Sequence, residues 1–149
     1  MGSECAICAK HRGVGALVGP VVFEDDLVVV THRPLANNTP VPGYLFVETR
    51  RHTPSVSTLT DAEASAVGWA VTRAARAIQH ELAPEFVFSA VTGRSVVHFH
   101  QHVFARPLGT PPAIPWPDTD SWPEGPRITA TELTPLIARL ASHFTPAAI

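Results

Sequence analysis

The chain has 149 residues, 45% of them hydrophobic, which suffices for one compact domain with an apolar core of its own. Its formal net charge of −2 at pH 7, without any run of lysine or arginine, argues against polymeric DNA or RNA as a partner. No apolar stretch approaches the about 20 residues that cross a bilayer, and the N-terminus resembles neither a secretory signal nor a full N-myristoylation motif. We therefore expect a cytoplasmic protein without a membrane partner.

Three short β-rich runs come first along the chain. Residues 21–23 and 27–31 flank an acidic turn, which predicts a hairpin. A third run at 44–48 follows the turn signal NNTPVPG at 37–43. The pattern therefore predicts three successive strands.

A long amphipathic helix is predicted after these strands. Thr60 and Glu63 form a capping-box pattern, and the apolar residues that follow recur at helical spacing: Val67, Val71, Ala74, Ala75, Ile78 and Leu82. This pattern predicts a helix of roughly 20 residues that ends before Pro84.

The rest of the chain is predicted to add two strands and a second helix. Residues 85–91 and 95–105 have the composition of strands, and residues 107–127 are too rich in proline for regular structure. Residues 130–144 predict a C-terminal helix. The order of elements predicts a single α+β domain over residues 1–149, with a mostly antiparallel five-stranded sheet, a long helix and a C-terminal helix.

Three histidines alternate with other residues inside the last predicted strand. Residues at every second position of a strand share one face, so His98, His100 and His102 should lie on the side opposite Phe99 and Gln101. At about 3.3 Å per residue, the outer two Cα atoms are about 13 Å apart, whereas zinc–nitrogen bonds measure about 2.0–2.1 Å. One metal ion therefore cannot easily hold all three. The alternative is that the three histidines are ordinary polar residues on a solvated strand face. Three histidines in register on one face instead favour chemistry on phosphate.

The two cysteines of the chain, Cys5 and Cys8, lie close together near the N-terminus. In a reducing compartment such a pair binds metal or performs redox chemistry more often than it forms a structural disulfide. A thioredoxin-type pair belongs after a strand, at the start of a helix, so the position favours metal binding.

The segments around the histidines resemble a known family. The motif His-x-His-x-His followed by two apolar residues, at 98–104, resembles the signature of the histidine triad (HIT) superfamily of nucleotide hydrolases and transferases. GRSVVHFHQH resembles the Gly-Gln-Ser-Val-x-His segment that precedes it in that family, and VPGYLFVETRRH at 41–52 resembles its Pro-Gly-His-x-Leu-Val-x-Pro-Lys-x-His segment. With the Cys-x-x-Cys pair, the resemblance covers about residues 5–107 and implies a HIT-like fold.

The resemblance implies a two-step reaction at the α-phosphorus of a nucleotide. His100 would form a nucleotidyl-histidine, which water cleaves in hydrolases and an acceptor takes up in transferases. His102 would donate to the phosphate, and Ser95 would support the leaving group or a phosphate oxygen. A histidine at 102, where the uridylyltransferases have glutamine, favours a hydrolase of the phosphoramidase or dinucleoside polyphosphate type.

Three further residues are candidate substrate contacts. Asn37 matches the Asp or Asn that contacts ribose in the family, or is a simple turn residue. Arg94 replaces the usual Gln and would contact phosphate. The alternative, which is commoner for arginine, is a solvent-exposed side chain without a substrate contact. Gln101 takes a position that is often apolar, and Tyr44 is a further departure because it replaces the usual His.

The zinc-containing branch of the superfamily implies a metal site. In some bacterial members, and in galactose-1-phosphate uridylyltransferase, two N-terminal cysteines join a histidine after the third strand and the first histidine of the triad. Carried over, the ligands are Cys5, Cys8, His52 and His98, a closed structural zinc site that involves the N-terminal segment 1–15. His98 would anchor its strand through the metal and leave His100 free, about 6.6 Å of strand further on.

Several alternatives stay open. A non-catalytic nucleotide-binding or regulatory protein would retain the triad pocket, and a mononuclear metalloenzyme would use the triad as ligands. The resemblance also implies a homodimer, because small members of the superfamily pair their sheets edge to edge. Trp116 and Trp122 would stack on a base or cover a dimer surface. Dinucleoside polyphosphates, nucleoside phosphoramidates and adenylated amines are all candidate substrates.

Overall fold

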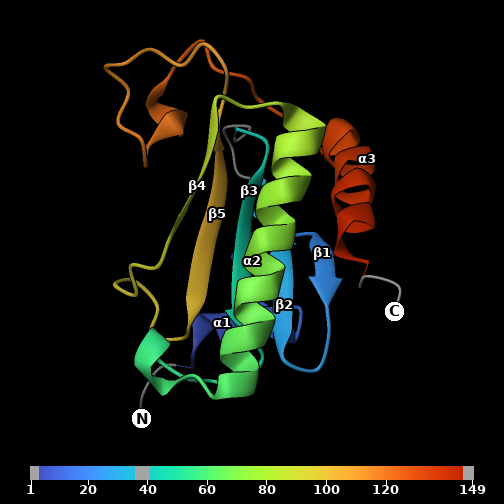
Figure 1. Ribbon diagram of the computed structural model, residues 1–149, viewed down its shortest axis with the longest axis vertical. Coiled ribbons are helices and arrows are strands. Elements are labelled where there is room, and N and C mark those ends of the chain that lie inside the picture. Colours follow the sequence, from blue (N-terminus) through green and yellow to red (C-terminus); the bar gives the residue numbers. More distant parts are fainter. Residues whose placement is uncertain (1–3, 36–40, 146–149) are drawn as a thin grey trace.

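The computed structural model describes residues 4–35 and 41–145 (Figure 1). Its helices and strands are, in chain order, α1 (Ala6–His11), β1 (Val21–Glu24), β2 (Val28–His32), β3 (Tyr44–Thr49), α2 (Asp61–Leu82), β4 (Phe86–Ala90), β5 (His100–Arg106) and α3 (Ala130–Ala141). Short 3-10 turns lie at Val56–Thr58, Thr119–Ser121 and Ser142–Phe144. The predicted α+β class is confirmed. None of the described helices is long and apolar enough to cross a membrane.

The strands form one antiparallel sheet in the order β1-β2-β3-β5-β4. α2 runs along one face of this sheet, and α3 lies beside α2 on the side of β1 (Figure 1). The connection through α2 carries the chain from β3 to the edge strand β4, and β5 then fills the place between them. The central strands β3 and β5 therefore lie side by side although about fifty residues separate them.

The core lies between the sheet and the two long helices. Alternate residues of the strands face α2, including Val28, Val30, Leu45, Val47 and Val103, and are fully buried. α2 meets them with small side chains, Ala70, Ala74 and Ala77, which let the helix approach the sheet closely. The other face of the sheet therefore keeps the alternating polar and aromatic residues.

The predicted start of α2 is confirmed. The Glu63 backbone N–H donates to Thr60 Oγ1 at 3.1 Å, and Glu63 Oε1 accepts from the Thr60 backbone N–H at 2.9 Å. Arg51 also donates to the Glu63 carboxylate, at 2.7 and 3.1 Å. The hydrogen bonds from Arg51 and from the Thr60 backbone lower the pKa of Glu63 to about 2. This charged pair ties the segment that carries His52 to the first turn of α2.

Two elements differ from the prediction. β5 begins at His100 instead of residue 95, because the preceding residues bond to the last residue of β3 and to the loop after it. His98 Nε2–H donates to the Thr49 carbonyl at 2.7 Å, and the Phe99 backbone N–H donates to the Thr53 carbonyl at 2.7 Å. The short helix α1 was not predicted. Cys5 caps it by accepting the Cys8 backbone N–H at 3.4 Å.

A buried histidine next to the β2–β3 connection makes stability depend on pH. His32 is fully buried; its Nδ1–H donates to the Arg33 carbonyl at 2.9 Å, and its Nε2 accepts the Gly43 backbone N–H at 3.0 Å. This arrangement requires a neutral ring, and burial lowers the pKa of His32 below 6.5.

We therefore expect the free energy of unfolding to fall as pH is lowered from about 6.5 through the lower pKa of folded His32. Between these two values the unfolded chain binds the proton and the folded chain does not, with a slope of at most about 1.4 kcal/mol per pH unit for one proton. Urea unfolding between pH 5 and pH 8 measures this slope. His32→Gln should flatten it, whereas His80→Gln at an exposed position should not. Equal slopes in His32→Gln and the unmodified protein would contradict the assignment.

Candidate functional site

The histidine row lies on the face of the sheet away from α2. Phe99 and Val103 pack into the core, so His98, His100 and His102 lie on the other side, as the alternation predicts. On the neighbouring strand β3, Glu48 pairs with His100, Phe46 with His102 and Tyr44 with Phe104. The open face of the two central strands thus carries both the imidazoles and an aromatic cluster.

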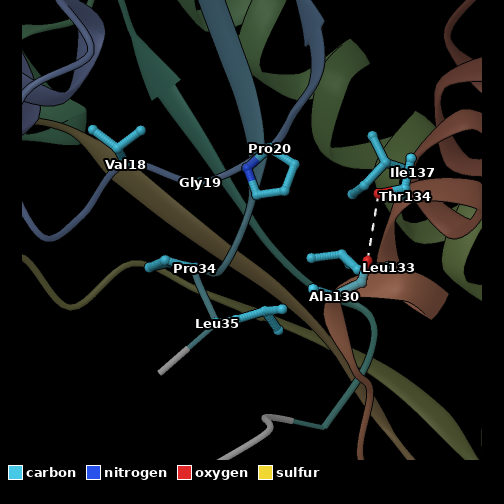
Figure 2. A pocket seen from close by; sticks show the side chains of 9 residues that line it. All are labelled: Val18, Gly19, Pro20, Pro34, Leu35, Ala130, Leu133, Thr134 and Ile137. Carbon is cyan, nitrogen blue, oxygen red and sulfur yellow. Dashed lines mark hydrogen bonds between the residues drawn. The ribbon is translucent and has the colours of Figure 1, made fainter. Parts of the chain in front are cut away.

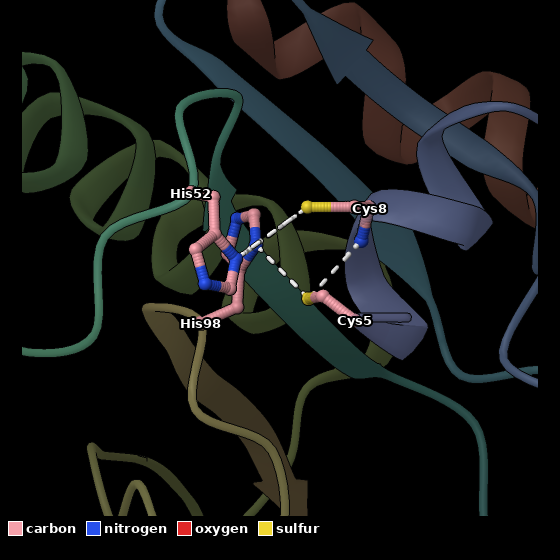
Figure 3. A group of neighbouring side chains, drawn as sticks. All are labelled: Cys5, Cys8, His52 and His98. Atoms are coloured by element: carbon pink, nitrogen blue, oxygen red, sulfur yellow. Dashed lines mark hydrogen bonds between the residues drawn. The ribbon is translucent and has the colours of Figure 1, made fainter. Parts of the chain in front are cut away.

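The structure brings Cys5, Cys8, His52 and His98 together (Figure 3). His98 Nδ1 lies 3.5 Å from each sulfur and 3.3 Å from His52 Nδ1, and the Cys8 sulfur lies 3.5 Å from His52 Nδ1. A tetrahedral zinc site with Zn–S of about 2.3 Å and Zn–N of about 2.0–2.1 Å requires S···N separations of about 3.5 Å and N···N of about 3.3 Å. The four residues therefore have the spacing of a tetrahedral ligand set.

The protonation chemistry of these four residues also suits a divalent cation. His98 Nε2–H donates to the Thr49 carbonyl, which leaves Nδ1 as a lone-pair ligand directed at the sulfurs. Burial and the adjacent Cys5 raise the pKa of the Cys8 thiol. Two neighbouring thiolates need a cation to stabilise them, and a metal that binds sulfur supplies it.

Helix α1 is fastened to the sheet beside this cluster by a buried carboxylate. Glu48 accepts from Lys10 Nζ at 2.8 Å and pairs with His11 Nε2 at 3.0 Å, and Lys10 also donates to Thr31 Oγ1 at 2.7 Å. Although burial opposes ionisation, the hydrogen bonds from His11 and Lys10 hold the pKa of Glu48 below its usual range. These bonds hold Cys5 and Cys8 over the end of the histidine row.

The ring of His100 is oriented by a backbone carbonyl. Its Nδ1–H donates to the backbone carbonyl of His98 at 2.8 Å, so Nε2 carries the lone pair. The ring is 6% exposed and lies 5.2 Å from the ring of His102, centroid to centroid. The carbonyl that orients His100 therefore belongs to a residue of the cysteine–histidine cluster.

Among the described residues, His102 has a hydrogen-bond partner at one ring nitrogen and none at the other. Its Nδ1 lies 2.8 Å from Tyr44 Oη, and its Nε2 is buried without a partner in the part of the chain that the structure describes. Burial and the neighbouring His100 lower the pKa of His102, which favours the neutral ring. A buried polar atom without a partner indicates a place for a ligand.

The other predicted site residues lie apart from this pair. Arg94 and Ser95 are exposed between β4 and β5, and Ser95 lines a pocket of about 490 Å³ together with Cys5 and His52. Gln101 Nε2 donates to Ser89 Oγ at 2.9 Å on the α2 side of the sheet, which argues against the predicted substrate contact. Asn37 lies outside the described residues.

Sequence reasoning missed two contacts of this face. Asp120, in the proline-rich segment 107–127, forms a bidentate pair with Arg33 at 2.6 and 3.0 Å. Trp116 of the same segment stacks on Phe104 with ring centroids 6.0 Å apart. One signal in the sequence indicates that this face is unusual, the replacement of the usual His by Tyr44. The contact between Asp120 and Arg33 has no such signal, because nothing in their spacing relates the two residues.

A separate apolar pocket of about 390 Å³ lies between α3 and the strand ends (Figure 2). Pro20 and Leu35 line one side, and Leu133 and Ile137 of α3 line the other. α3 packs on the face of the sheet opposite the histidines. Among the described residues, no acid, base or thiol lines this pocket, so these residues supply no catalytic group there.

Comparison with known proteins agrees with this geometry. No curated protein matches the sequence significantly. A Hit-like protein involved in cell-cycle regulation from Bartonella henselae has a TM-score of 0.68 at 13% identity, over 97% of this chain and 99% of that one. A Zn-bound histidine triad family protein from Mycobacterium smegmatis has a TM-score of 0.64 at 21% identity, over 93% and 94% of the two chains. A hypothetical histidine triad nucleotide-binding protein from Sulfolobus tokodaii strain7 has a TM-score of 0.67 at 15% identity, over 93% and 91%.

These structures share the fold with this chain, and their low identities show nothing beyond it. The sequence profile of the HIT domain matches residues 18–108, a span that contains β1 to β5 and all three histidines. Because this match covers more than half of the 149 residues, the chain belongs to the HIT domain family.

Proposed function

We propose that this protein binds a nucleotide on the histidine face and cleaves it at the α-phosphorus through a nucleotidyl-histidine on His100. The observation that carries the proposal is the hydrogen bond from His100 Nδ1–H to the His98 carbonyl, which leaves Nε2 as the nucleophile. Membership of the HIT domain family supports a nucleotide as the substrate, and the Sulfolobus tokodaii protein is described as nucleotide-binding.

The chemistry requires two displacements at one phosphorus. His100 Nε2 forms an N–P bond while the bond from phosphorus to the leaving phosphate or amine breaks, and the leaving group takes a proton from solvent. The positive charge that develops on the imidazole is stabilised at Nδ1–H by the His98 carbonyl. Water then attacks phosphorus and gives up a proton to solvent, the N–P bond breaks, and a nucleoside monophosphate leaves with His100 neutral again. If an acceptor replaces water, the same intermediate supports transfer.

We further propose that Cys5, Cys8, His52 and His98 hold one structural zinc ion. The tetrahedral spacing of the ligand atoms supports this proposal, and the Mycobacterium smegmatis relative is described as Zn-bound. Four protein ligands leave no open position, so the ion would supply structure and no Lewis acid chemistry. It would lock α1 to the sheet and hold His98, whose carbonyl orients His100.

Incubation with adenosine 5′-phosphoramidate and with diadenosine polyphosphates tests the proposed activity. Chromatography should show release of AMP, and intact mass after neutral quenching should show an adenylylated chain. If the protein is instead a non-catalytic binder, calorimetry should show AMP binding, but no AMP should be released from these substrates and no adenylylated chain should form. If the protein is instead a mononuclear metalloenzyme that uses the triad as ligands, turnover should depend on the metal and no adenylylated chain should form. The geometry disfavours it, because His98 Nδ1 faces the cysteines and His102 Nδ1 contacts Tyr44.

We also propose that the protein is a homodimer. Several exposed apolar side chains belong to the edge strand β4 or to the segments that flank β5: Phe86, Val91, Val97, Leu108 and Trp116. An open edge strand beside apolar side chains favours pairing with a second copy. Light scattering at micromolar concentration should give twice the chain mass, and Phe86→Lys should shift it toward the monomer. A monomer over the whole concentration range would contradict the proposal.

A further inference from the structure

We propose that Tyr44 is a positioning residue that fixes the tautomer of His102, so that His102 presents Nε2–H to a phosphate oxygen of the substrate. The inference deepens the proposed function and rests on it for the identity of the ligand. The starting observation is the contact of 2.8 Å between Tyr44 Oη and His102 Nδ1. A neutral imidazole donates from one nitrogen and accepts at the other, so this contact decides which nitrogen carries the proton.

The hydrogen-bond inventory favours tyrosine as the donor. If Tyr44 accepted a proton from His102 Nδ1–H, its own hydroxyl hydrogen would need another acceptor, and none contacts it within the described part of the chain. His102 Nε2 would then be a buried lone pair without a donor. If Tyr44 donates, its hydroxyl hydrogen and His102 Nδ1 are both satisfied, and of these groups the His102 Nε2–H alone is left to meet a ligand. Burial also raises the pKa of Tyr44, so its hydroxyl keeps the proton that it donates.

The ring of Tyr44 is held by two packing partners. It stacks on Phe104 with centroids 5.0 Å apart and an interplanar angle of 10°, and the Arg33 guanidinium lies 4.6 Å above its centroid. Asp120 accepts two hydrogen bonds from the Arg33 guanidinium and also accepts the Val41 backbone N–H at 3.3 Å. The proline-rich segment therefore reaches the histidine face through Asp120 and keeps the tyrosine hydroxyl in place.

The unsatisfied atoms of the structure gather around this tyrosine. Among the described residues, two buried side-chain polar atoms have no hydrogen-bond partner, Arg33 Nε and His102 Nε2. Arg33 packs on the face of the Tyr44 ring, and His102 contacts its hydroxyl. With the proposed tautomer both atoms are donors, which suits an anionic oxygen and would repel a cation. The ligand class that matches is therefore an oxyanion, and the proposed function supplies it as a phosphate.

Histidine tautomers are directly visible in long-range ¹H–¹⁵N correlation spectra of protein labelled with ¹⁵N-histidine. In the unmodified protein at pH 7.5, His102 should be a single Nε2–H tautomer; its signals are assigned by their loss in His102→Asn. Tyr44→Phe keeps the stacked ring and removes the hydroxyl, so it should yield a mixture of tautomers or the Nδ1–H form. Ser89→Ala, which removes a hydrogen bond of 2.8 Å to the His102 backbone carbonyl, should leave the tautomer unchanged.

Kinetics give the second measurement. Tyr44→Phe should lower kcat for adenosine 5′-phosphoramidate by about 10- to 100-fold, because the donor to the phosphate is misplaced, while KM changes less than about threefold. An Nδ1–H tautomer in the unmodified protein, or an unchanged Nε2–H tautomer in folded Tyr44→Phe, would overturn the inference. If Tyr44→Phe does not fold, the unmodified protein's spectrum still decides the tautomer. The spectra need no turnover, so an inactive protein with the expected tautomer would contradict the proposed function and leave the role of Tyr44 standing.

Discussion

Replacing His100 by alanine should lower the release of AMP from adenosine 5′-phosphoramidate by at least about a thousandfold, because loss of a covalent nucleophile removes the whole reaction path. Initial rates at saturating substrate measure the effect, and intact mass should no longer detect an adenylylated chain. The His98 carbonyl loses its partner, so unfolding should become easier by only about 1–3 kcal/mol. The variant should therefore be folded and inactive.

Three comparisons make this result specific. His102→Ala should slow the reaction but still form the adduct, because the nucleophile remains. His80→Ala, at an exposed position far along α2, should keep the full rate. AMP affinity of His100→Ala, measured by calorimetry, should change far less than its turnover. Near-native hydrolysis by His100→Ala would refute the proposed mechanism.

The fold follows from the sequence wherever a long local pattern exists. α2 was predicted from its capping box and its apolar stripe, and both ends agree with the structure because the signals are local. α1 has only six residues, too few to show a period, and its place depends on the pairing of Lys10 and His11 with Glu48. The last strand was predicted too early, since Val96 and Val97 have strand propensity but lack a partner strand.

The site was predictable to a different degree at each residue. Alternation alone placed His100 and His102 on one face, because the period of a strand is a property of the backbone. The same alternation puts Gln101 on the other face, so its assignment to the substrate conflicted with the pattern that located the histidines. The contact between Arg33 and Asp120 joins residues 87 positions apart. Such a pairing depends on how the loop after β5 folds back, which no local pattern encodes.

The double variant Cys5→Ser/Cys8→Ser should lose the zinc that we expect at about one ion per chain, and it should be markedly less stable. The hydrophobic core remains, so the domain should still fold, but α1 is then held by the buried side chain of Ile7 and the contacts of Lys10 and His11 with Glu48, without the metal. A loss of about 3 kcal/mol would lower the melting temperature by about 6–12 °C for a chain of this size. Elemental analysis of gently purified protein and thermal unfolding measure the two effects.

The matched control removes ligand-type residues elsewhere. His80, Glu81 and His143 form a second group with ligand atoms within 4.8 Å of one another, but Arg139 pairs with Glu81 at 3.2 Å and opposes a cation there. His80→Ser/His143→Ser should therefore keep the zinc content and nearly the same melting temperature. His98→Ala should lose both zinc and turnover, because its side chain binds the ion and fixes the carbonyl that orients His100, whereas His102→Ala should slow turnover and keep its zinc. Unchanged zinc and melting temperature in the cysteine variant, or loss of chemistry on zinc removal without any change in α1, would contradict a structural role for the metal.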